Sequence, residues 1–275
     1  MTDTRNDALQ LGLVLDTVFP GLPLGERMAH VADAGLRNIE LWLAERLCPD
    51  PGDLARLAER AGLRINSLVM GSPDGRVGGG LTDPAKRPEW LARLRSCLDY
   101  ANAAGIDAGI VCTGNVVDGA DEAATRQSVL DGLKASAELA ERAGVTLLLE
   151  ALNTEVDHPG YWLTSADEGA ALVREVGSQR LKLLFDCYHM RIMGGDVIAQ
   201  IDRTIDTIGH FHVAGVPGRH EPFTGEMDYR PIFDHLRRLD WRGVAAFEYG
   251  PSLDDHAESL RRSIAACLGA REQRP

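Results

Sequence analysis

The chain of 275 residues has a formal net charge of −12, with 44% hydrophobic and 25% charged residues. Its length suits two ordinary domains or one barrel of about 250 residues. The negative charge, with no cluster of Lys and Arg, argues against a nucleic-acid partner, because affinity for nucleic acid depends largely on basic surface.

Membrane association and secretion are also not expected. The opening segment MTDTRNDALQ lacks the apolar stretch of a signal peptide, and no run of about 18 apolar residues could cross a membrane. Five dispersed cysteines without a CxxC pair are typical of a reduced chain. We therefore expect a soluble, cytoplasmic protein without a membrane partner, and a homo-oligomer stays open.

One short pattern recurs along the chain: a helix-like stretch that ends in Ala-Gly, followed at once by an apolar run. It occurs at 31–41, 58–69, 101–111 and 140–150. A glycine at this point suits the left-handed position just past a helix end. Each copy is a helix-turn-strand step, and such steps in series indicate parallel strands joined by crossover helices.

In chain order, the expected strands are 11–16, 37–42, 64–69, 107–112, 145–150, 181–185, 209–213 and 243–248. The expected helices are 23–34, 51–61, 85–104, 122–143, 165–176, 195–207, 229–239 and 253–267. This alternation predicts an α/β protein in which the whole chain, 1–275, forms a single closed (β/α)8 TIM barrel with flexible ends at 1–9 and 269–275. An open doubly wound sheet is the main alternative, although no GxGxxG follows the first strand.

The glycine-rich stretch 71–84, GSPDGRVGGGLTDP, follows the third strand. A barrel places this loop on the rim where active sites lie. Its residues are consistent both with an ordinary surface loop and with a lid over a site.

Four residues that suit a divalent metal stand at the ends of successive predicted strands: Glu150, Asp186, His212 and Glu248. Because the carboxyl ends of barrel strands meet at one rim, these side chains can converge. Each one alone has an ordinary explanation, as a helix cap or a packed histidine, but four in register weaken that explanation. The oxygen-rich set favours Mn²⁺, Mg²⁺ or Co²⁺ over Zn²⁺.

Further rim residues are candidates for substrate binding. His189 lies one turn beyond Asp186, and Arg219 is a candidate fork for carboxylate or hydroxyl oxygens, with a plain surface arginine as the alternative. His210 shares the strand face of His212, and a packing role is expected for it. The residues that follow the second, third and fifth strands and could shape the pocket are Trp42, Asn66, Asn153, Glu155, His158 and Trp162.

The stretches LLLEALN, LLFDCYHM, GHFHVAGVPGRHEPFTGEMDY and AFEY resemble the xylose-isomerase-like barrel superfamily of sugar isomerases and epimerases. Within it, they are most similar to the hydroxypyruvate isomerase group. The resemblance covers most of the chain, and its specific motifs lie between 145 and 250. It implies that the four strand-end residues hold a metal and that Glu150 and Glu248 are catalytic, exchanging a substrate proton through an enediolate. It also implies that His189 and Arg219 bind substrate oxygens.

The expected activity is therefore a metal-dependent isomerase of carbohydrate metabolism that acts on a small hydroxy-keto acid or ketose. Conversion of hydroxypyruvate to tartronate semialdehyde is the favoured reaction. A ketose 3-epimerase or a related isomerase or dehydratase on the same metal site stays open, since ketose epimerases carry His where some hydroxypyruvate isomerases carry an amide in place of His212. A nuclease of the endonuclease IV type would need more histidines and a basic face. A sugar-binding or structural barrel without metal is the non-enzymatic alternative.

Overall fold

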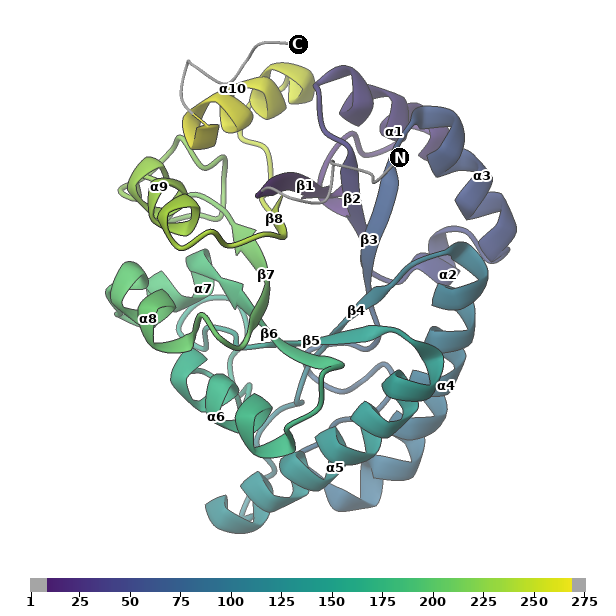
Figure 1. Cartoon of the computed structure of the whole chain (residues 1–275), viewed down its shortest axis with the longest axis vertical. Helices are drawn as coiled ribbons and strands as arrows, with labels where there is room; N and C mark the ends of the chain where they lie inside the picture. The colour runs from purple at the N-terminus through teal and green to yellow at the C-terminus, as the bar shows by residue number, and fades with distance from the viewer. Residues whose placement is uncertain (1–8, 269–275) are drawn as a thin grey trace.

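The computed structural model describes residues 9–268, so the segments 1–8 and 269–275 of the predicted flexible ends lie outside the described residues. Eight parallel strands close into a barrel in chain order, and β8 pairs with β1. Figure 1 looks down this barrel and shows the helices arranged around it. The prediction of a TIM barrel is confirmed. The strands are β1 (Gln10–Val14), β2 (Asn38–Leu41), β3 (Arg64–Val69), β4 (Ala108–Val111), β5 (Thr146–Glu150), β6 (Leu181–Asp186), β7 (Ile208–Val213) and β8 (Val244–Phe247).

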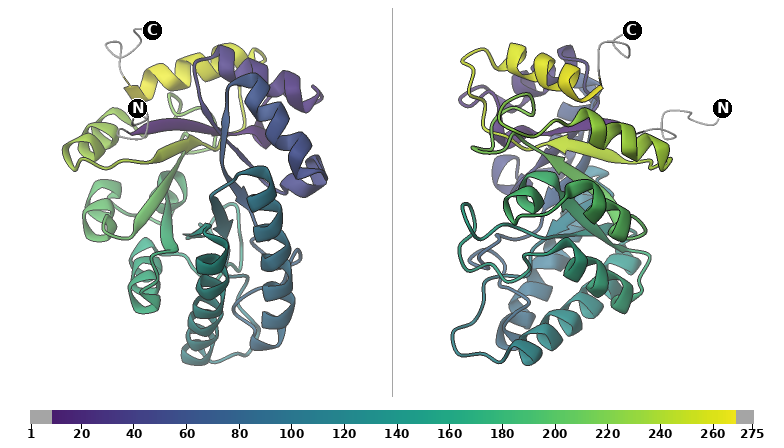
Figure 2. Two further views of the ribbon diagram at one scale, coloured as in Figure 1. Left: turned by 45° about the vertical axis from the view of Figure 1, so that its right-hand side comes forward. Right: turned by 90° about the vertical axis from the view of Figure 1, so that its left-hand side faces the viewer.

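The outer layer is helical, and its longest members, α4 and α5, run along one flank of the barrel in the side views of Figure 2. No helix within residues 9–268 combines the length and hydropathy that a membrane span requires. The helices are η2 (Leu15–Thr17), α1 (Leu24–Asp33), α2 (Ala44–Leu47), α3 (Pro51–Ala61), η3 (Pro84–Lys86), α4 (Arg87–Ala104), α5 (Glu122–Ala143), α6 (Ala166–Val176), α7 (Cys187–Ile192), α8 (Val197–Thr204), α9 (Arg230–Arg238) and α10 (His256–Leu268).

The recurring Ala-Gly step ends helices as its sequence predicts. Gly105 and Gly144 follow α4 and α5 with φ values of 71° and 74°, in the left-handed region that glycine adopts without a Cβ clash. The next residues lead directly into β4 and β5, so each glycine turns the chain from the outer layer back into the barrel.

The predicted first strand is too long at its carboxyl end, where η2 begins, and two short α-helices were not predicted. Strand β1 ends at Val14 because side-chain hydrogen bonds turn the chain there. Thr17 Oγ1 donates to the Val14 carbonyl at 3.0 Å, and Asp16 Oδ2 accepts from the Trp42 amide at 2.9 Å. Helices α2 and α7 span four and six residues, too few to produce a hydrophobic period in the sequence.

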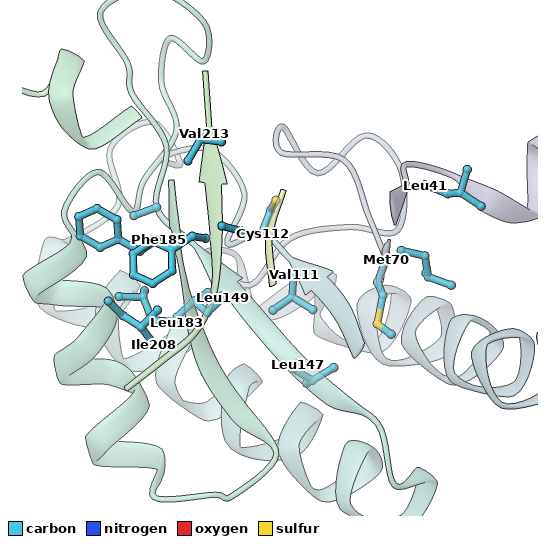
Figure 3. Packing of buried hydrophobic residues seen from close by; sticks show 14 of the residues in the cluster. Leu41, Met70, Val111, Cys112, Leu147, Leu149, Leu183, Phe185, Ile208 and Val213 are labelled. Carbon is cyan, nitrogen blue, oxygen red and sulfur yellow. The ribbon is translucent and has the colours of Figure 1, made fainter. Parts of the chain in front are cut away.

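Alternation along the strands divides the core into two parts. On β5, Leu147 and Leu149 belong to the large apolar layer between strands and helices, while Leu148 belongs to a separate small cluster with Ile110 and Leu184. Since successive side chains of a strand point to opposite faces, the small cluster fills the barrel interior. Figure 3 shows part of the outer layer, with Leu183, Phe185 and Ile208 gathered near β6 and β7.

The amino end of α5 offers a test of local stability. Asp121 is its N-cap and accepts a hydrogen bond from the Ala124 amide at 2.9 Å. We expect Asp121→Ala to lower the free energy of unfolding by about 1 kcal/mol, because an amide at the helix end loses its acceptor. Urea unfolding of Asp121→Ala beside Lys134→Ala, an exposed position of the same helix, measures the difference. Equal stability of the two variants would contradict the capping role.

Candidate active site

The four strand-end residues do converge. Glu150, Asp186, His212 and Glu248 each offer a ligand atom, and these atoms all lie within 4.8 Å of one another. Asp186 pairs in register with His212, and Glu150 and Glu248 end or directly follow the strands on either side, β5 and β8. These residues, called the rim cluster below, occupy the carboxyl end of the barrel.

Two atoms of the rim cluster lack a hydrogen-bond partner. His212 Nδ1 lies 3.4 Å from Glu150 Oε1 and 3.2 Å from Glu248 Oε2. Both His212 Nδ1 and Glu150 Oε1 are buried without a hydrogen bond. Burial also raises the pKa of Asp186 to about 7. Buried polar atoms and clustered acids of this kind are costly alone and are relieved by a cation, so three carboxylates and an imidazole nitrogen fit a divalent metal ion.

Asp186 serves two neighbours at once. Its Oδ1 caps α7 by accepting hydrogen bonds from the amides of Tyr188 at 2.7 Å and His189 at 3.2 Å. Its Oδ2 lies 3.5 Å from His189 Nε2 and 3.8 Å from Arg219 Nη2. Asp186 can therefore cap the helix through Oδ1 while Oδ2 remains available as a metal ligand.

Both oxygens of Glu248 receive hydrogen bonds. Arg219 Nη2 donates to Oε2 at 2.6 Å, and the Trp42 indole Nε1 donates to Oε1 at 2.9 Å. Burial opposes ionisation of Glu248, but Arg219 and His212 outweigh it and hold the pKa of this carboxyl well below its usual range. Arg219 itself has a left-handed backbone with φ of 52°, and its carbonyl accepts from the Gly250 amide at 2.9 Å. A non-glycine residue in this region is strained, and such residues concentrate at functional sites.

A cavity of about 340 Å³ opens onto the rim cluster. The loop 71–84 contributes part of its wall, and the Ser72 hydroxyl holds this loop by donating to Asp74 at 2.6 Å and accepting from the Val77 amide at 2.8 Å. A larger hollow of about 480 Å³ lies between Pro222–Arg230 and α10, away from the rim cluster. The residues that line the smaller cavity are Trp42, Leu43, Val69, Gly71, Ser72, Pro73, Cys112, Glu150, Leu152, His158, Arg219 and Glu248.

Only some of the predicted substrate-binding residues line the cavity. Trp42 and Arg219 line the cavity, whereas His189 is fully buried beside it with Nδ1 2.6 Å from Asn153 Nδ2. Asn66 and Glu155 do not line it. Asn66 lies in mid-strand, so its inward side chain ends below the rim and borders a hollow at the amino ends of the strands. Glu155 is an exposed loop residue.

Two residues that the sequence analysis did not single out contact the site. Glu40 of β2 is buried, and its Oε2 accepts a hydrogen bond from His212 Nε2 at 2.9 Å. Burial opposes ionisation of Glu40, but its histidine neighbours outweigh burial and hold the pKa of this carboxyl well below its usual range. Asp157 accepts from the Tyr188 hydroxyl at 2.8 Å and lies 3.9 Å from Arg219 Nη1. The sequence signal for Glu40 was an acidic residue inside the short strand NIEL. For Asp157 the sequence offered only a position in a loop.

Comparison with known proteins identifies the family. Residues 28–267 match the family described as xylose isomerase-like TIM barrel. The chain belongs to this family. It is 36% identical over 233 residues to the 2-oxo-tetronate isomerase of Cupriavidus necator, which covers 82% of this chain and 86% of that protein. It is 33% identical over 269 residues to a protein of Streptomyces coelicolor assigned as a hydroxypyruvate isomerase, at 94% and 96% coverage.

Solved structures share the barrel. A protein described as AP endonuclease, family 2 from Brucella melitensis superposes with a TM-score of 0.82 at 26% identity, covering 94% of this chain and 97% of that one. L-ribulose 3-epimerase superposes with a TM-score of 0.80 at 23% identity, covering 97% and 100%, and this likeness concerns the fold alone. Isomerases are among the relatives that match most of its length, so the chain is an enzyme of the isomerase/epimerase family.

The metal fit can be tested without any substrate. We expect the chelator-treated chain to bind Mn²⁺ in a calorimetric titration, and Glu150→Gln to weaken that binding by at least roughly 10- to 100-fold, the range seen when a neighbour of a metal ligand is removed. Glu155→Gln is the matched control, because it makes the same change at an exposed residue outside the rim cluster. Equal affinities for the two variants would remove Glu150 from the ligand set.

Proposed function

We propose that this enzyme isomerises a small 2-keto-3-hydroxy acid, moving a proton between C3 and C2 while the keto group moves the opposite way. Hydroxypyruvate is the three-carbon member of this class, and 2-oxo-tetronate, which names the Cupriavidus relative, is a four-carbon member. The observation that carries the proposal is the guanidinium of Arg219, held 2.6 Å from Glu248 at the edge of the rim cluster and facing a cavity.

Arg219 suits a carboxylate next to the reacting carbons. Its fork carries five N–H donors that match a carboxylate in pairs. In the chain alone it faces three acids, since Nη2 lies near Glu248 and Asp186 and Nη1 lies 3.9 Å from Asp157. Burial opposes its charge, but Glu248 and Asp186 outweigh burial and raise the pKa of Arg219. A substrate carboxylate would therefore meet a permanently charged partner.

The two glutamates supply the proton transfer. A divalent ion bound at the rim cluster would polarise adjacent substrate oxygens and stabilise the enediolate. One glutamate removes the proton from the first carbon and the other returns a proton to its neighbour. Glu248 is oriented by Trp42 and Arg219, while Glu150 Oε1 receives no hydrogen bond from the described residues.

The rest of the cavity wall favours a short acid over a free ketose. Beyond the rim cluster and Arg219, the wall is mainly apolar, with Leu43, Val69, Pro73 and Leu152 among its members. A ketohexose would bring several hydroxyls against this wall, and a buried hydroxyl without a partner costs about 1–3 kcal/mol. Epimerisation of a ketose is the second candidate, because ketose epimerases carry a histidine at the position of His212.

The two candidates differ in the substrates that they turn over. We expect the Mn²⁺-loaded enzyme to convert hydroxypyruvate or 2-oxo-tetronate in deuterated water with uptake of deuterium at carbon, followed by proton NMR. Glu150→Gln and Glu248→Gln should each lower kcat by roughly 10²- to 10⁴-fold, because each removes one proton carrier. Glu155→Gln should keep wild-type kcat. Turnover of free ketoses alone, with neither acid converted, would favour the epimerase instead.

A second measurement concerns substrate length. His158 is a half-buried imidazole on the cavity wall, and burial lowers its pKa, so it meets a substrate as a neutral hydrogen-bonding group. We expect His158→Leu to lower kcat/KM for 2-oxo-tetronate by about tenfold, the value of one hydrogen bond to its terminal hydroxyl. Hydroxypyruvate, which lacks the fourth carbon, should lose less, and Mn²⁺ affinity should be unchanged. Equal losses for both acids would remove His158 from length selection.

A further inference from the structure

A second group of buried polar residues lies directly beneath the rim cluster. Glu40 of β2, Asn66 of β3 and His210 of β7 are all at most 5% exposed. Glu40 connects this group to the rim cluster, because its carboxylate is the hydrogen-bond partner of His212 Nε2. None of the three lines the cavity above the rim cluster, so their effect on the site passes through His212.

We propose that Glu40 is a positioning residue that selects which nitrogen of His212 binds the metal. The inference rests on the metal site of the proposed function and not on its substrate. Nε2 lies 2.9 Å from Glu40 Oε2 and donates to it. Nδ1, on the other side of the ring, lies 3.2 Å and 3.4 Å from the two glutamates of the rim cluster and has no hydrogen-bond partner.

Only one nitrogen of a neutral imidazole can bind a metal ion. A neutral ring carries one N–H and one lone pair, and only the lone pair can bind a metal. An acceptor fixed against Nε2 keeps the proton there and turns the lone pair of Nδ1 toward the acids. Glu40 also fixes the ring orientation, since a rotated imidazole would lose its only hydrogen bond of good geometry.

Glu40 is itself held in place from below. Asn66 Nδ2 donates to Glu40 Oε1 at 2.7 Å, and His210 Nε2 lies 2.6 Å from the same oxygen. The His210 contact lacks hydrogen-bond geometry, whereas the His212 contact has it. Oε1 is therefore engaged by the residues below, and Oε2 remains for His212. This arrangement gives Asn66 an indirect part in the site, as a support for Glu40.

A second metal ion is the competing explanation for the same atoms. Glu40, His210 and His212 offer ligand atoms within 4.8 Å of one another. An ion there would need the Nε2 lone pair of His212, and the ring would then bridge two ions. The Asn66 donor on Glu40 and the hydrogen bond to His212 favour one ion per chain, with Glu40 outside its ligand set.

Glu40→Gln tests the assignment in the full-length chain. A glutamine offers one acceptor oxygen in place of two, so it cannot accept from Asn66 and from His212 on separate oxygens. With its amide group toward His212, it would favour a proton on Nδ1. We expect the Mn²⁺ affinity measured by calorimetry to fall by roughly 10- to 100-fold, as for other outer neighbours of metal-bound histidines. The wild-type stoichiometry should be one ion per chain.

A spectroscopic readout separates positioning from general loss of structure. In the Mg²⁺-loaded wild type, the ¹⁵N signals of His212 should show a protonated Nε2 and an unprotonated Nδ1. His210→Asn is the matched control: it removes the other histidine that touches Glu40, but leaves the His212 hydrogen bond, so Mn²⁺ affinity should stay close to the wild type. If Glu40→Gln does not fold, Glu40→Asp draws the carboxylate back by one methylene and should also weaken binding.

Three results would overturn the inference. They are wild-type Mn²⁺ affinity in Glu40→Gln, an equal loss of affinity in His210→Asn and Glu40→Gln, and two ions per wild-type chain of which Glu40→Gln loses one. A wild-type chain that binds no divalent ion would instead defeat the metal site of the proposed function. Failure to convert either acid would leave the Glu40 measurement untouched, so the two proposals fail separately.

Discussion

The interior of this barrel must hold four carboxylates that water barely reaches. Glu40, Glu150, Asp186 and Glu248 are all at most 9% exposed. The effective cost of burying an ionised group is several kcal/mol unless it is paired and hydrogen-bonded. Three nearby groups provide that compensation: His210 contacts Glu40, His212 lies between Glu40 and the two rim glutamates, and Arg219 approaches Glu248 and Asp186 from the loop above. The need to neutralise these acids connects the fold to the site, because the same charge arrangement suits a divalent cation.

The closed barrel brings the four residues of the rim cluster together at its carboxyl end. Asp186 and His212 are register partners on adjacent strands, and inward positions alternate with residues of the outer apolar layer. Beside them, Ile110, Leu148 and Leu184 form a small apolar cluster in the interior, and Leu184 is the register partner of both Glu150 and His210. A dry surrounding strengthens each ion pair and makes each missing partner more costly. The unpartnered Nδ1 of His212 is therefore informative, because a native interior seldom leaves such an atom without a role.

The sequence was sufficient for the barrel and the rim cluster because both follow from local patterns. Apolar runs, glycine stops and acids at strand ends are each visible within a few residues. Glu40 was not predictable in this way, since its partner lies 172 positions away and only the closure of the barrel brings β2 opposite β7. Asn66 and Glu155 show the converse limit. Asn66 belongs to an expected strand, and Glu155 to the loop after one. How far each side chain lies from the rim, and where it points, depends on strand register and turn geometry, which composition does not encode.

Whether the substrate is a keto acid or a ketose stays open from the sequence because of the histidine at position 212. The position of His212 inside the barrel, below the loops, bears on that point. The nitrogens of His212 lie beside acids, Glu40 on one side and Glu150 and Glu248 on the other, and its ring packs edge-on against His210. Because these neighbours lie in the barrel strands or directly at their ends, His212 would act on the proposed metal and proton carriers and not on the substrate directly. Several other groups that face the cavity come from loops, with Arg219 after β7, His158 after β5 and Pro73 after β3. Under the proposed function, selection between an acid and a ketose would depend on these loop residues, and the histidine at position 212 would not weigh against a keto-acid substrate.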